Sequence, residues 1–328
     1  MGCLNRTNRF KPNISATSPQ ISRRSCYHAW GGKRGAAPAF LRSRQPRAIG
    51  LLEHLLSGGN TDMATSAQIW SEKIVEAAGG AVQLVKGGDG EPLLILHDEL
   101  GHPGWLNYHQ ALAQDYTLYI PSHSGFGDTV RQEWIMNMRD MAGWYLEVLD
   151  DLGLDRVNLM GISLGGWLAA EMATMSPQTF KKLILVGPAG IRPPTGEIFD
   201  MFLVVAKEFI LKGILDPDTT SEFSTICPDE PTPELVERWE VAREEASRMS
   251  WRPYMHYPGL SHLLHRLKTL PTLVVWGKED AIVPLSAGQV YHENIQGSRL
   301  AVIDNCGHHP EIEKTEEFLQ LVKEFLAA

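Results

Sequence analysis

Residues 63–328 are predicted to fold as an α/β protein, with a mostly parallel twisted sheet that carries helices on both faces. The first observation is that short β-forming runs alternate with stretches of helical periodicity, an order that produces parallel strands joined by right-handed crossovers. The second is that several short runs are continuously apolar, as in strands buried on both faces of a sheet. These runs are LLIL at 93–96, LILV at 183–186 and LVVW at 273–276.

Seven segments have the composition and length of strands. In chain order they are 81–86, 92–97, 117–121, 157–160, 182–187, 272–277 and 299–304. The glycine-rich sequence at 87–90 separates the first two, and such a sequence is typical of a hairpin turn. We therefore expect the first two strands to be joined by a hairpin.

Two other stretches have the apolar pattern of amphipathic helices. In 138–152 the apolar residues recur at spacings of three and four and would share one face. These residues are Met141, Trp144, Tyr145, Val148, Leu149 and Leu152. The segment 313–326 closes the chain with a second apolar stripe, formed by Phe318, Leu319, Val322 and Phe325.

About 80 residues separate the strand that ends at Gly187 from the strand that begins at Thr272. This segment has helical periodicity and several prolines, and a structureless loop of that length is uncommon in a compact domain. We therefore predict an inserted helical lid at 191–267, with the core of the fold formed by 63–190 and 268–328.

The charge of the chain is uneven and bears on its partners. Residues 1–62 hold ten Lys or Arg and two acids, whereas 63–328 hold 20 basic and 37 acidic residues, a net charge of −17. A surface of that sign repels nucleic acid, which is therefore not an expected partner. No run of 18 apolar residues occurs, which predicts no membrane span. We expect a monomer or homodimer that acts on a small-molecule substrate.

The four cysteines, Cys3, Cys26, Cys227 and Cys306, are far apart and form no CxxC pair. This spacing indicates neither a disulfide framework nor a zinc site, and it favours a reducing, cytoplasmic location. The sequence also contains no Walker or dinucleotide-binding phosphate loop. No cofactor and no metal are therefore expected.

The first 62 residues differ from the rest, because they are rich in Arg, Ser, Gly and Pro and contain no acid before Glu53. Three interpretations are open. One is a transit peptide, which would place the protein in an organelle. The second is a disordered basic tail that binds an acidic partner. The third is upstream sequence that precedes a true start at Met63. The third is favoured, because a sequence typical of an enzyme N-terminus begins at Met63.

The most informative segment is VNLMGISLGGWLAAE at 157–171. It combines a strand, a G-x-S-x-G turn centred on Ser163 and a helix, which is the order of a nucleophile elbow. The sharp turn would hold the Ser163 hydroxyl above the sheet, and Gly161 and Gly165 would let the strand and the helix approach closely. The first N–H groups of the helix, including that of Leu164, could stabilise a developing oxyanion.

Two later loops offer the acid and the base that a nucleophilic serine requires, in the chain order Ser, Asp, His. Asp280 follows the strand at 272–277, and α/β sheets bind ligands at the carboxyl ends of their strands. His308 follows the last predicted strand and could take the hydroxyl proton while Asp280 holds its other ring nitrogen. Glu279 is the alternative to Asp280, and His309 is the alternative to His308.

The chain resembles the α/β-hydrolase superfamily of lid-bearing Ser-His-Asp enzymes, which includes carboxylesterases, carbon–carbon bond hydrolases of the meta-cleavage type and cofactor-free haloperoxidases. The resemblance covers about 80–328 and rests on PLLILH, PSHSGFGDT, GISLGGWLAAEMA, KLILVGPAG, TLVVWGKEDAIVP and NCGHHPEIEKTEEFL. It implies the α/β-hydrolase fold and a catalytic triad of Ser163, Asp280 and His308. Haloalkane dehalogenases and epoxide hydrolases of this fold carry Asp at the elbow, so Ser163 argues against both.

The resemblance also implies an oxyanion hole in the loop after PLLILH, where the family usually has His-Gly-x. Here Asp98 replaces the glycine, and the N–H of Glu99 is expected to act together with that of Leu164; Leu100 is the alternative donor. Carboxylates that point into an oxyanion hole would disfavour negative charge there. We therefore expect Asp98 and Glu99 to point outward or to cap nearby backbone, the alternative being that Glu99 or His102 shapes an unusual pocket.

Five side chains near these motifs are expected to line the substrate pocket. They are His97, His102, Trp105, His123 and Trp167. A metal site in the loop at 97–102 is not expected, because its histidines and acids have no second cluster of ligands elsewhere.

The leading hypothesis is a serine hydrolase that cleaves a small hydrophobic carboxylic ester through an acyl-enzyme intermediate. The many aromatic and aliphatic residues of the lid predict an apolar pocket. A second hypothesis is carbon–carbon hydrolysis of a dienoic diketone, which would need a cationic lid residue such as Arg192 or Arg252 to hold a carboxylate. A third is a ligand receptor on a hydrolase fold that signals through movement of the lid.

Overall fold

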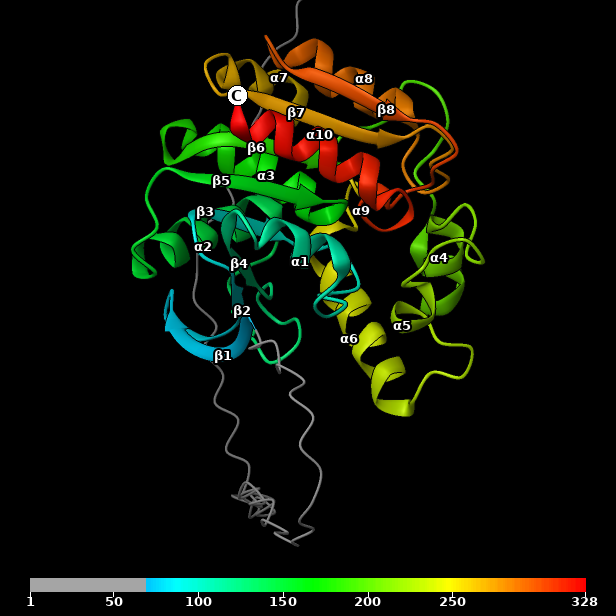
Figure 1. Ribbon diagram of the computed structural model, residues 1–328. Coiled ribbons are helices and arrows are strands. Elements are labelled where there is room, and N and C mark those ends of the chain that lie inside the picture. The colour runs from blue at the N-terminus through cyan, green and yellow to red at the C-terminus, as the bar shows by residue number, and fades with distance from the viewer. Residues whose placement is uncertain (1–68) are drawn as a thin grey trace, which may run out of the picture. The chain divides into compact units, whose positions relative to one another are not determined.

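The computed structural model describes residues 69–328, so the interpretations of residues 1–62 concern a segment outside that range. Eight strands form one sheet in the order β1-β2-β4-β3-β5-β6-β7-β8 (Figure 1). They are β1 (Trp70–Ala77), β2 (Gly80–Gly87), β3 (Glu91–Leu96), β4 (Tyr116–Pro121), β5 (Val157–Ile162), β6 (Phe180–Val186), β7 (Thr272–Gly277) and β8 (Arg299–Ile303). The β1–β2 and β2–β4 pairs are antiparallel, and all other pairs are parallel. The predicted α/β fold with a mostly parallel sheet is confirmed.

Helices cover both faces of this sheet. On one face lie α2 (Met138–Asp151), α3 (Leu164–Met175) and α8 (Leu285–Asn294), and on the other lie α1 (Asn107–Leu112) and α10 (Thr315–Ala327). The 3-10 turn η1 (Pro177–Thr179) follows α3, and the short α9 (Pro310–Glu313) precedes α10. Figure 1 shows α1 and α10 in front of the central strands. Because both faces are covered, β5 and β7 are buried at every residue, which explains their continuous apolar sequences.

The two amphipathic segments form helices, as predicted. α2 begins after Asn137, whose side-chain oxygen accepts hydrogen bonds from the N–H groups of Arg139 and Asp140. These bonds satisfy two of the free donors at the start of the helix. The apolar stripe of α2 is buried, including the large side chains of Trp144 and Tyr145. The second segment corresponds to α10.

The hairpin expected at 87–90 is wrong. β2 and β3 flank that turn, but β4 lies between them in the sheet, so the turn joins two strands that do not pair. The observed hairpin is the preceding one, in which β1 pairs with β2 through Ala78 and Gly79. β1 was not predicted because it is an edge strand with mostly exposed residues and no apolar run. Turn residues indicate a change of direction, whereas strand pairing depends on contacts distant in the chain.

The chain between β6 and β7 forms a helical insertion on the core. Its elements are η2 (Met201–Leu203), α4 (Ala206–Gly213), α5 (Phe223–Ile226), α6 (Pro233–Ser250), α7 (Leu260–Leu263) and η3 (Leu264–Leu267), all within the segment predicted at 191–267. Figure 1 shows α4, α5 and α6 beside the carboxyl ends of the parallel strands. No helix in the described residues is both long and apolar enough to cross a membrane.

A buried ion pair ties α6 to the core. Glu245 of α6 is 1% exposed. Its carboxylate contacts Arg131, in the loop after β4, and lies 3.2 Å from the Arg248 Nε of its own helix. A carboxylate is removed from water at a large cost unless such partners compensate it, so these contacts anchor α6.

Glu245→Ala is predicted to lower the free energy of unfolding by about 2–4 kcal/mol, because two guanidinium groups lose a buried partner. Chemical denaturation measures this loss, and limited proteolysis tests whether α6 becomes accessible to cleavage. Glu244→Ala is the matched control, since the Glu244 side chain is 74% exposed and 3.8 Å from Arg131. Equal effects of the two substitutions would contradict the anchoring role of Glu245.

Candidate active site

Ser163 lies in the sharp turn between β5 and α3. Its backbone angles are φ 49° and ψ −113°, a region that residues with a side chain rarely adopt. Two glycines make the turn possible. A Cβ on Gly161 would overlap the carbonyl oxygen of Gly165, and a Cβ on Gly165 would overlap the carbonyl oxygens of Leu96 and His97. The strand and the helix therefore approach more closely than any larger residue permits.

Backbone hydrogen bonds hold this turn in place. The Ser163 N–H donates to the Val186 carbonyl at 2.9 Å, and the Ser163 carbonyl accepts from the N–H groups of Trp167 and Ala189, both at 3.1 Å. The Ser163 side chain is fully buried, and its Oγ has no hydrogen-bond partner among the described residues. The backbone of the turn is thus held by three hydrogen bonds, whereas the Ser163 hydroxyl makes none within residues 69–328.

Asp280 and His308 form a hydrogen-bonded pair between two loops. Asp280 Oδ2 lies 2.7 Å from His308 Nδ1, and both side chains are fully buried. The other oxygen of Asp280 accepts from the N–H groups of Ile282 and Val283 at 2.8 and 2.9 Å. Since the carboxylate accepts, Nδ1 carries the hydrogen, and Nε2 of a neutral His308 can accept a proton. This Nε2 has no partner within residues 69–328.

Close backbone contacts place this pair beside Ser163. The Val186 carbonyl accepts the hydrogen bond of the Ser163 N–H, and Gly187 is the next residue. A Cβ at Gly187 would lie 3.2 Å from the His308 ring. A Cβ at Gly277 would overlap the carbonyl oxygen of Gly307, so β7 and the loop that carries His308 are in contact. The Asp280–His308 pair therefore lies near the turn of Ser163 at the carboxyl ends of the strands, but no hydrogen bond joins Ser163 Oγ to His308 Nε2.

The alternatives to Asp280 and His308 have other partners. Glu279 accepts a hydrogen bond from the Cys306 N–H at 3.0 Å and so caps the loop backbone. His309 Nδ1 lies 2.9 Å from Glu311 Oε1, a pair that the sequence analysis missed although only one residue separates the two. Burial lowers the pKa of His309, but the Glu311 charge and hydrogen bond outweigh it and raise the pKa to about 10. His309 is therefore an imidazolium at neutral pH.

The pKa of His308 results from opposing effects. Burial lowers it and the neighbouring His309 lowers it further, whereas the charge of Asp280 and the hydrogen bond to it raise it, with a small additional increase from Glu99. The net pKa lies above the ordinary value of 6.5. An imidazolium that forms on His308 during proton transfer is thus stabilised.

The loop after β3 has both occupied and free N–H donors. The N–H of Leu100 donates to Asp98 Oδ1 at 2.8 Å, and the N–H of Gly101 donates to the Asp98 carbonyl at 3.4 Å. The N–H groups of Glu99 and Leu164 make no hydrogen bond to any part of the chain that the structure describes. This pattern favours Glu99 over Leu100 as the donor that would act with Leu164.

The two carboxyl groups of this loop have different environments. Asp98 caps the backbone, as expected, and burial together with the neighbouring Glu99 raises its pKa to about 7. Glu99 is 1% exposed, and neither of its oxygens has a hydrogen-bond partner among the described residues. The expectation that both acids point outward or cap backbone is therefore wrong for Glu99. The alternative, that Glu99 or His102 shapes an unusual pocket, stays a prediction, since His102 but not Glu99 is among the residues that line the cavities beside this loop.

His97 and His123, predicted to line the pocket, connect the loops after β3 and β4. His97 Nε2 accepts from the His123 N–H, and His123 Nε2 donates to the His97 carbonyl, both at 3.0 Å. His97 Nδ1 donates to the Asp98 carbonyl at 2.8 Å, and His123 Nδ1 lies 2.6 Å from the Tyr145 hydroxyl. Burial lowers the pKa of both rings, to about 3 for His123. All four ring nitrogens are thus used within the protein.

The other three predicted pocket residues lie in different places. His102 lines three cavities beside the loop. Trp105 stacks on Trp70, with ring centroids 5.5 Å apart. Trp167 Nε1 donates to Glu171 at 3.3 Å, and its ring lines a separate cavity. No group of three or more His, Cys, Asp or Glu that could hold a metal occurs within residues 69–328.

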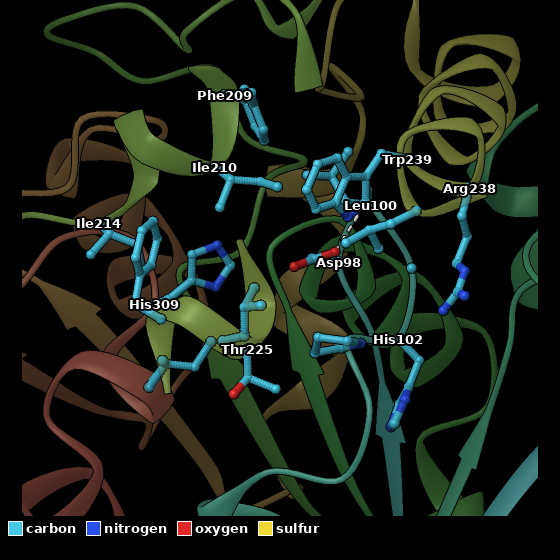
Figure 2. Close-up of a pocket in the computed structure, with 16 residues that line it drawn as sticks. Asp98, Leu100, His102, Phe209, Ile210, Ile214, Thr225, Arg238, Trp239 and His309 are labelled. Atoms are coloured by element: carbon cyan, nitrogen blue, oxygen red, sulfur yellow. Dashed lines mark hydrogen bonds between the residues drawn. The ribbon is translucent and has the colours of Figure 1, made fainter. Parts of the chain in front are cut away.

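An apolar cavity of about 80 Å³ lies between the loop at 98–103 and the helical insertion (Figure 2). The insertion contributes Phe209, Ile210, Ile214, Phe223, Leu235 and Trp239 to its wall. The charged residues of the lining are Asp98, His309 and Arg238. In Figure 2, the Asp98 carboxyl and the His309 ring lie on facing sides of this space. The cavity can hold a small apolar group beside the loop after β3, and Ser163, Asp280 and His308 are not among its lining residues.

Several known proteins resemble this chain. Residues 93–321 match the model of a family described as the alpha/beta hydrolase family. The 2-hydroxymuconate semialdehyde hydrolase of Pseudomonas sp. (strain CF600) is 29% identical over 265 residues, which cover 76% of this chain and 92% of that protein. The 2-hydroxy-6-oxo-6-phenylhexa-2,4-dienoate hydrolase of Comamonas testosteroni is 29% identical over 268 residues, which cover 73% and 88%. A bacterial membrane phospholipase A has the same fold, with a TM-score of 0.68, 22% identity and coverage of 79% and 86%.

Gly165→Ala is predicted to lower the free energy of unfolding by about 1–3 kcal/mol, because the added Cβ would overlap backbone carbonyls after β3. Displacement of the elbow should also slow the labelling of Ser163 by a fluorophosphonate. Gly143→Ala in α2 is the control, since nothing lies within 4 Å of its Cβ position and alanine favours a helix. An unchanged denaturation midpoint for Gly165→Ala would refute the close packing at the elbow.

The rate of fluorophosphonate labelling is predicted to rise with pH through an apparent pKa above 6.5. The reason is that only neutral His308 can take the Ser163 proton, and its pKa in the folded protein is raised. Asp280→Asn should move this rise to lower pH and slow labelling throughout, because burial then lowers the His308 pKa without the opposing charge of Asp280. Burial raises the pKa of Asp98 to about 7, so Asp98→Asn separates its contribution. A labelling rate that stays constant between about pH 5 and 9 would rule out His308 as the base.

Proposed function

Because the chain belongs to the alpha/beta hydrolase family, we propose that it is a serine hydrolase that cleaves a small hydrophobic carboxylic ester. Ser163 is the nucleophile, His308 the base and Asp280 the acid that orients the base. The observation that carries this proposal is the buried 2.7 Å hydrogen bond between Asp280 and His308 beside the strained turn at Ser163. The same three roles recur in serine hydrolases of unrelated folds.

In the first half of the reaction, Ser163 Oγ attacks the ester carbonyl carbon and its proton passes to His308 Nε2. The Asp280 carboxylate stabilises the imidazolium that results. The N–H groups of Glu99 and Leu164 donate to the oxyanion of the tetrahedral intermediate. The bond to the alkoxy oxygen then breaks, and the alcohol leaves with the proton from His308.

In the second half, water attacks the acyl group on Ser163 and gives a proton to His308. The tetrahedral intermediate collapses, the carboxylic acid leaves, and Ser163 recovers its proton. The helical insertion acts as a lid in this scheme, because it supplies most of the apolar wall of the cavity. Since Ser163 is fully buried, the lid or the loop at 98–103 must move to admit the ester.

A second candidate function is carbon–carbon bond hydrolysis. Two relatives are named for the hydrolysis of a semialdehyde and of a dienoate, and Arg238 lines the apolar cavity where it could hold a carboxylate. Arg192 and Arg252, the cations considered from the sequence, line other cavities. Against this candidate, the Asp98 carboxyl lines the same cavity and, when ionised, repels an anionic substrate. Ester hydrolysis is therefore the leading proposal.

Ser163→Ala is predicted to lower kcat/KM for p-nitrophenyl esters by at least about 10⁴-fold, because the nucleophile is lost. The small cavity should favour acetate to butyrate over octanoate. Steady-state kinetics across this series measures both effects, with Ser71→Ala on the exposed part of β1 as control. Turnover of 2-hydroxy-6-oxo-6-phenylhexa-2,4-dienoate without ester turnover would replace the leading proposal by the second candidate. Labelling of Ser163 without turnover of either would indicate a receptor.

A further inference from the structure

Three consecutive N–H groups in the loop of the proposed base are bound by acceptors from other parts of the chain. The N–H of Gly307 donates to Glu313 Oε2 at 3.1 Å, and the N–H of His309 donates to Glu313 Oε1 at 3.3 Å. Between them, the N–H of His308 donates to the carbonyl oxygen of Gly213 at 2.7 Å. One carboxylate therefore holds the backbone on both sides of His308.

The same carboxylate also reaches the helical insertion. Glu313 Oε2 accepts a third hydrogen bond, from the N–H of Leu215 at 2.8 Å. Leu215 lies two residues after Gly213, the last residue of α4. Glu313, at the end of α9, thus joins the end of α4 to the loop of His308.

The loop and the insertion are closely packed where these hydrogen bonds lie. A Cβ at Gly307 would be 2.6 Å from the Gly213 carbonyl oxygen and 2.8 Å from Glu313 Oε1. It would also be 2.9 Å from the Leu215 nitrogen. These distances are shorter than an ordinary non-bonded contact. A displacement of the end of α4 must therefore disturb the loop of His308.

The side chain of His308 takes its position from this backbone. Its Nδ1 lies 2.7 Å from Asp280 Oδ2, and the Asp280 carboxylate is held separately by N–H groups of its own loop. The hydrogen bond between Asp280 and His308 therefore requires both loops to keep their places. A misplacement of about 1 Å can slow a catalysed reaction by about 10²-fold.

We propose that Glu313 is a positioning residue that holds His308 in place for proton transfer and makes that place depend on the helical insertion. This inference rests on the proposed function, because a base is needed only if Ser163 is the nucleophile. Glu313 is not among the residues that line the apolar cavity. It acts on the reaction through the backbone of His308, not through the substrate.

The test uses the full chain as wild type, Glu313→Ala and Glu313→Gln. The glutamine keeps one acceptor oxygen, whereas the alanine keeps none. Glu317→Gln is the matched control, since that side chain is exposed in the first turn of α10. The measurements are kcat and KM for p-nitrophenyl butyrate, the pH dependence of fluorophosphonate labelling, hydrogen exchange and the Tm.

Glu313→Ala should lower kcat by about 30- to 100-fold and change KM by less than about threefold, because the base moves while the cavity is kept. Glu313→Gln should lie between the alanine variant and the wild type. Hydrogen exchange at Leu215 should become faster, since its N–H loses its acceptor. Glu317→Gln should match the wild type in all four measurements.

The rise of labelling with pH should move to lower pH in Glu313→Ala. Asp280 and Glu99 raise the pKa of His308, whereas burial and His309 lower it. A looser contact with Asp280 weakens the largest of the raising effects, so the pKa of His308 falls. A residue that only stabilised the fold would lower the Tm and leave this profile in place.

A lower Tm for Glu313→Ala with an unchanged kcat and pH profile would overturn the positioning role. A lower kcat with unchanged exchange at Leu215 would overturn its dependence on the insertion. If Glu313→Ala does not fold, Glu313→Gln decides both points. Labelling needs the base but no ester turnover, so wild-type labelling without ester hydrolysis would remove the proposed function alone, and the labelling rates would still decide the role of Glu313.

Discussion

The close approach of backbone segments at the carboxyl ends of β3, β5 and β7 is the constraint on which the site depends. Glycine is required at 161 and 165, since a Cβ at either position would overlap a carbonyl oxygen, and Gly277 meets Gly307 in the same way. These contacts force the turn at Ser163 into a strained conformation, and the buried sheet around it offsets the strain. The nucleophile is therefore placed by rigid strands rather than by a flexible loop.

Buried charge is the second property of the site. Asp280 accepts a hydrogen bond from His308 at 2.7 Å, and Glu311 accepts one from His309 at 2.9 Å. The two pairs differ in consequence: His308 keeps a free Nε2 for proton transfer, whereas His309 is held as an imidazolium. Glu99 is the one acid in this group without a donor among the described residues. The buried carboxylates beside the two histidines therefore have hydrogen-bond partners, whereas the Glu99 carboxyl group in the loop after β3 has none within residues 69–328.

The helical insertion completes the cavity from the opposite side. Its helices supply aliphatic and aromatic side chains, while the core supplies the loop at 98–103, which includes Asp98, and His309. The insertion is joined to the core by the ion pair between Glu245 and Arg131 and by the hydrogen bond from the His308 N–H to the Gly213 carbonyl. Apolar side chains of the insertion also belong to the main core of the fold. The insertion is therefore packed against the loop that carries His308.

The sequence by itself determined the fold class, most strand positions, the elbow and the two residues now found as the Asp280–His308 pair. These features are encoded locally, in apolar runs, in glycine spacing and in acids or histidines directly after strands. It could not show that the turn at 87–90 joins unpaired strands, that His97 and His123 bind each other's backbone, or that Arg238 rather than Arg192 lines the cavity. Nor could it show that Asp98 finds a backbone partner while Glu99 finds none. Only the tertiary structure decided these points, because pairing, burial and hydrogen-bond satisfaction depend on residues far apart in the chain.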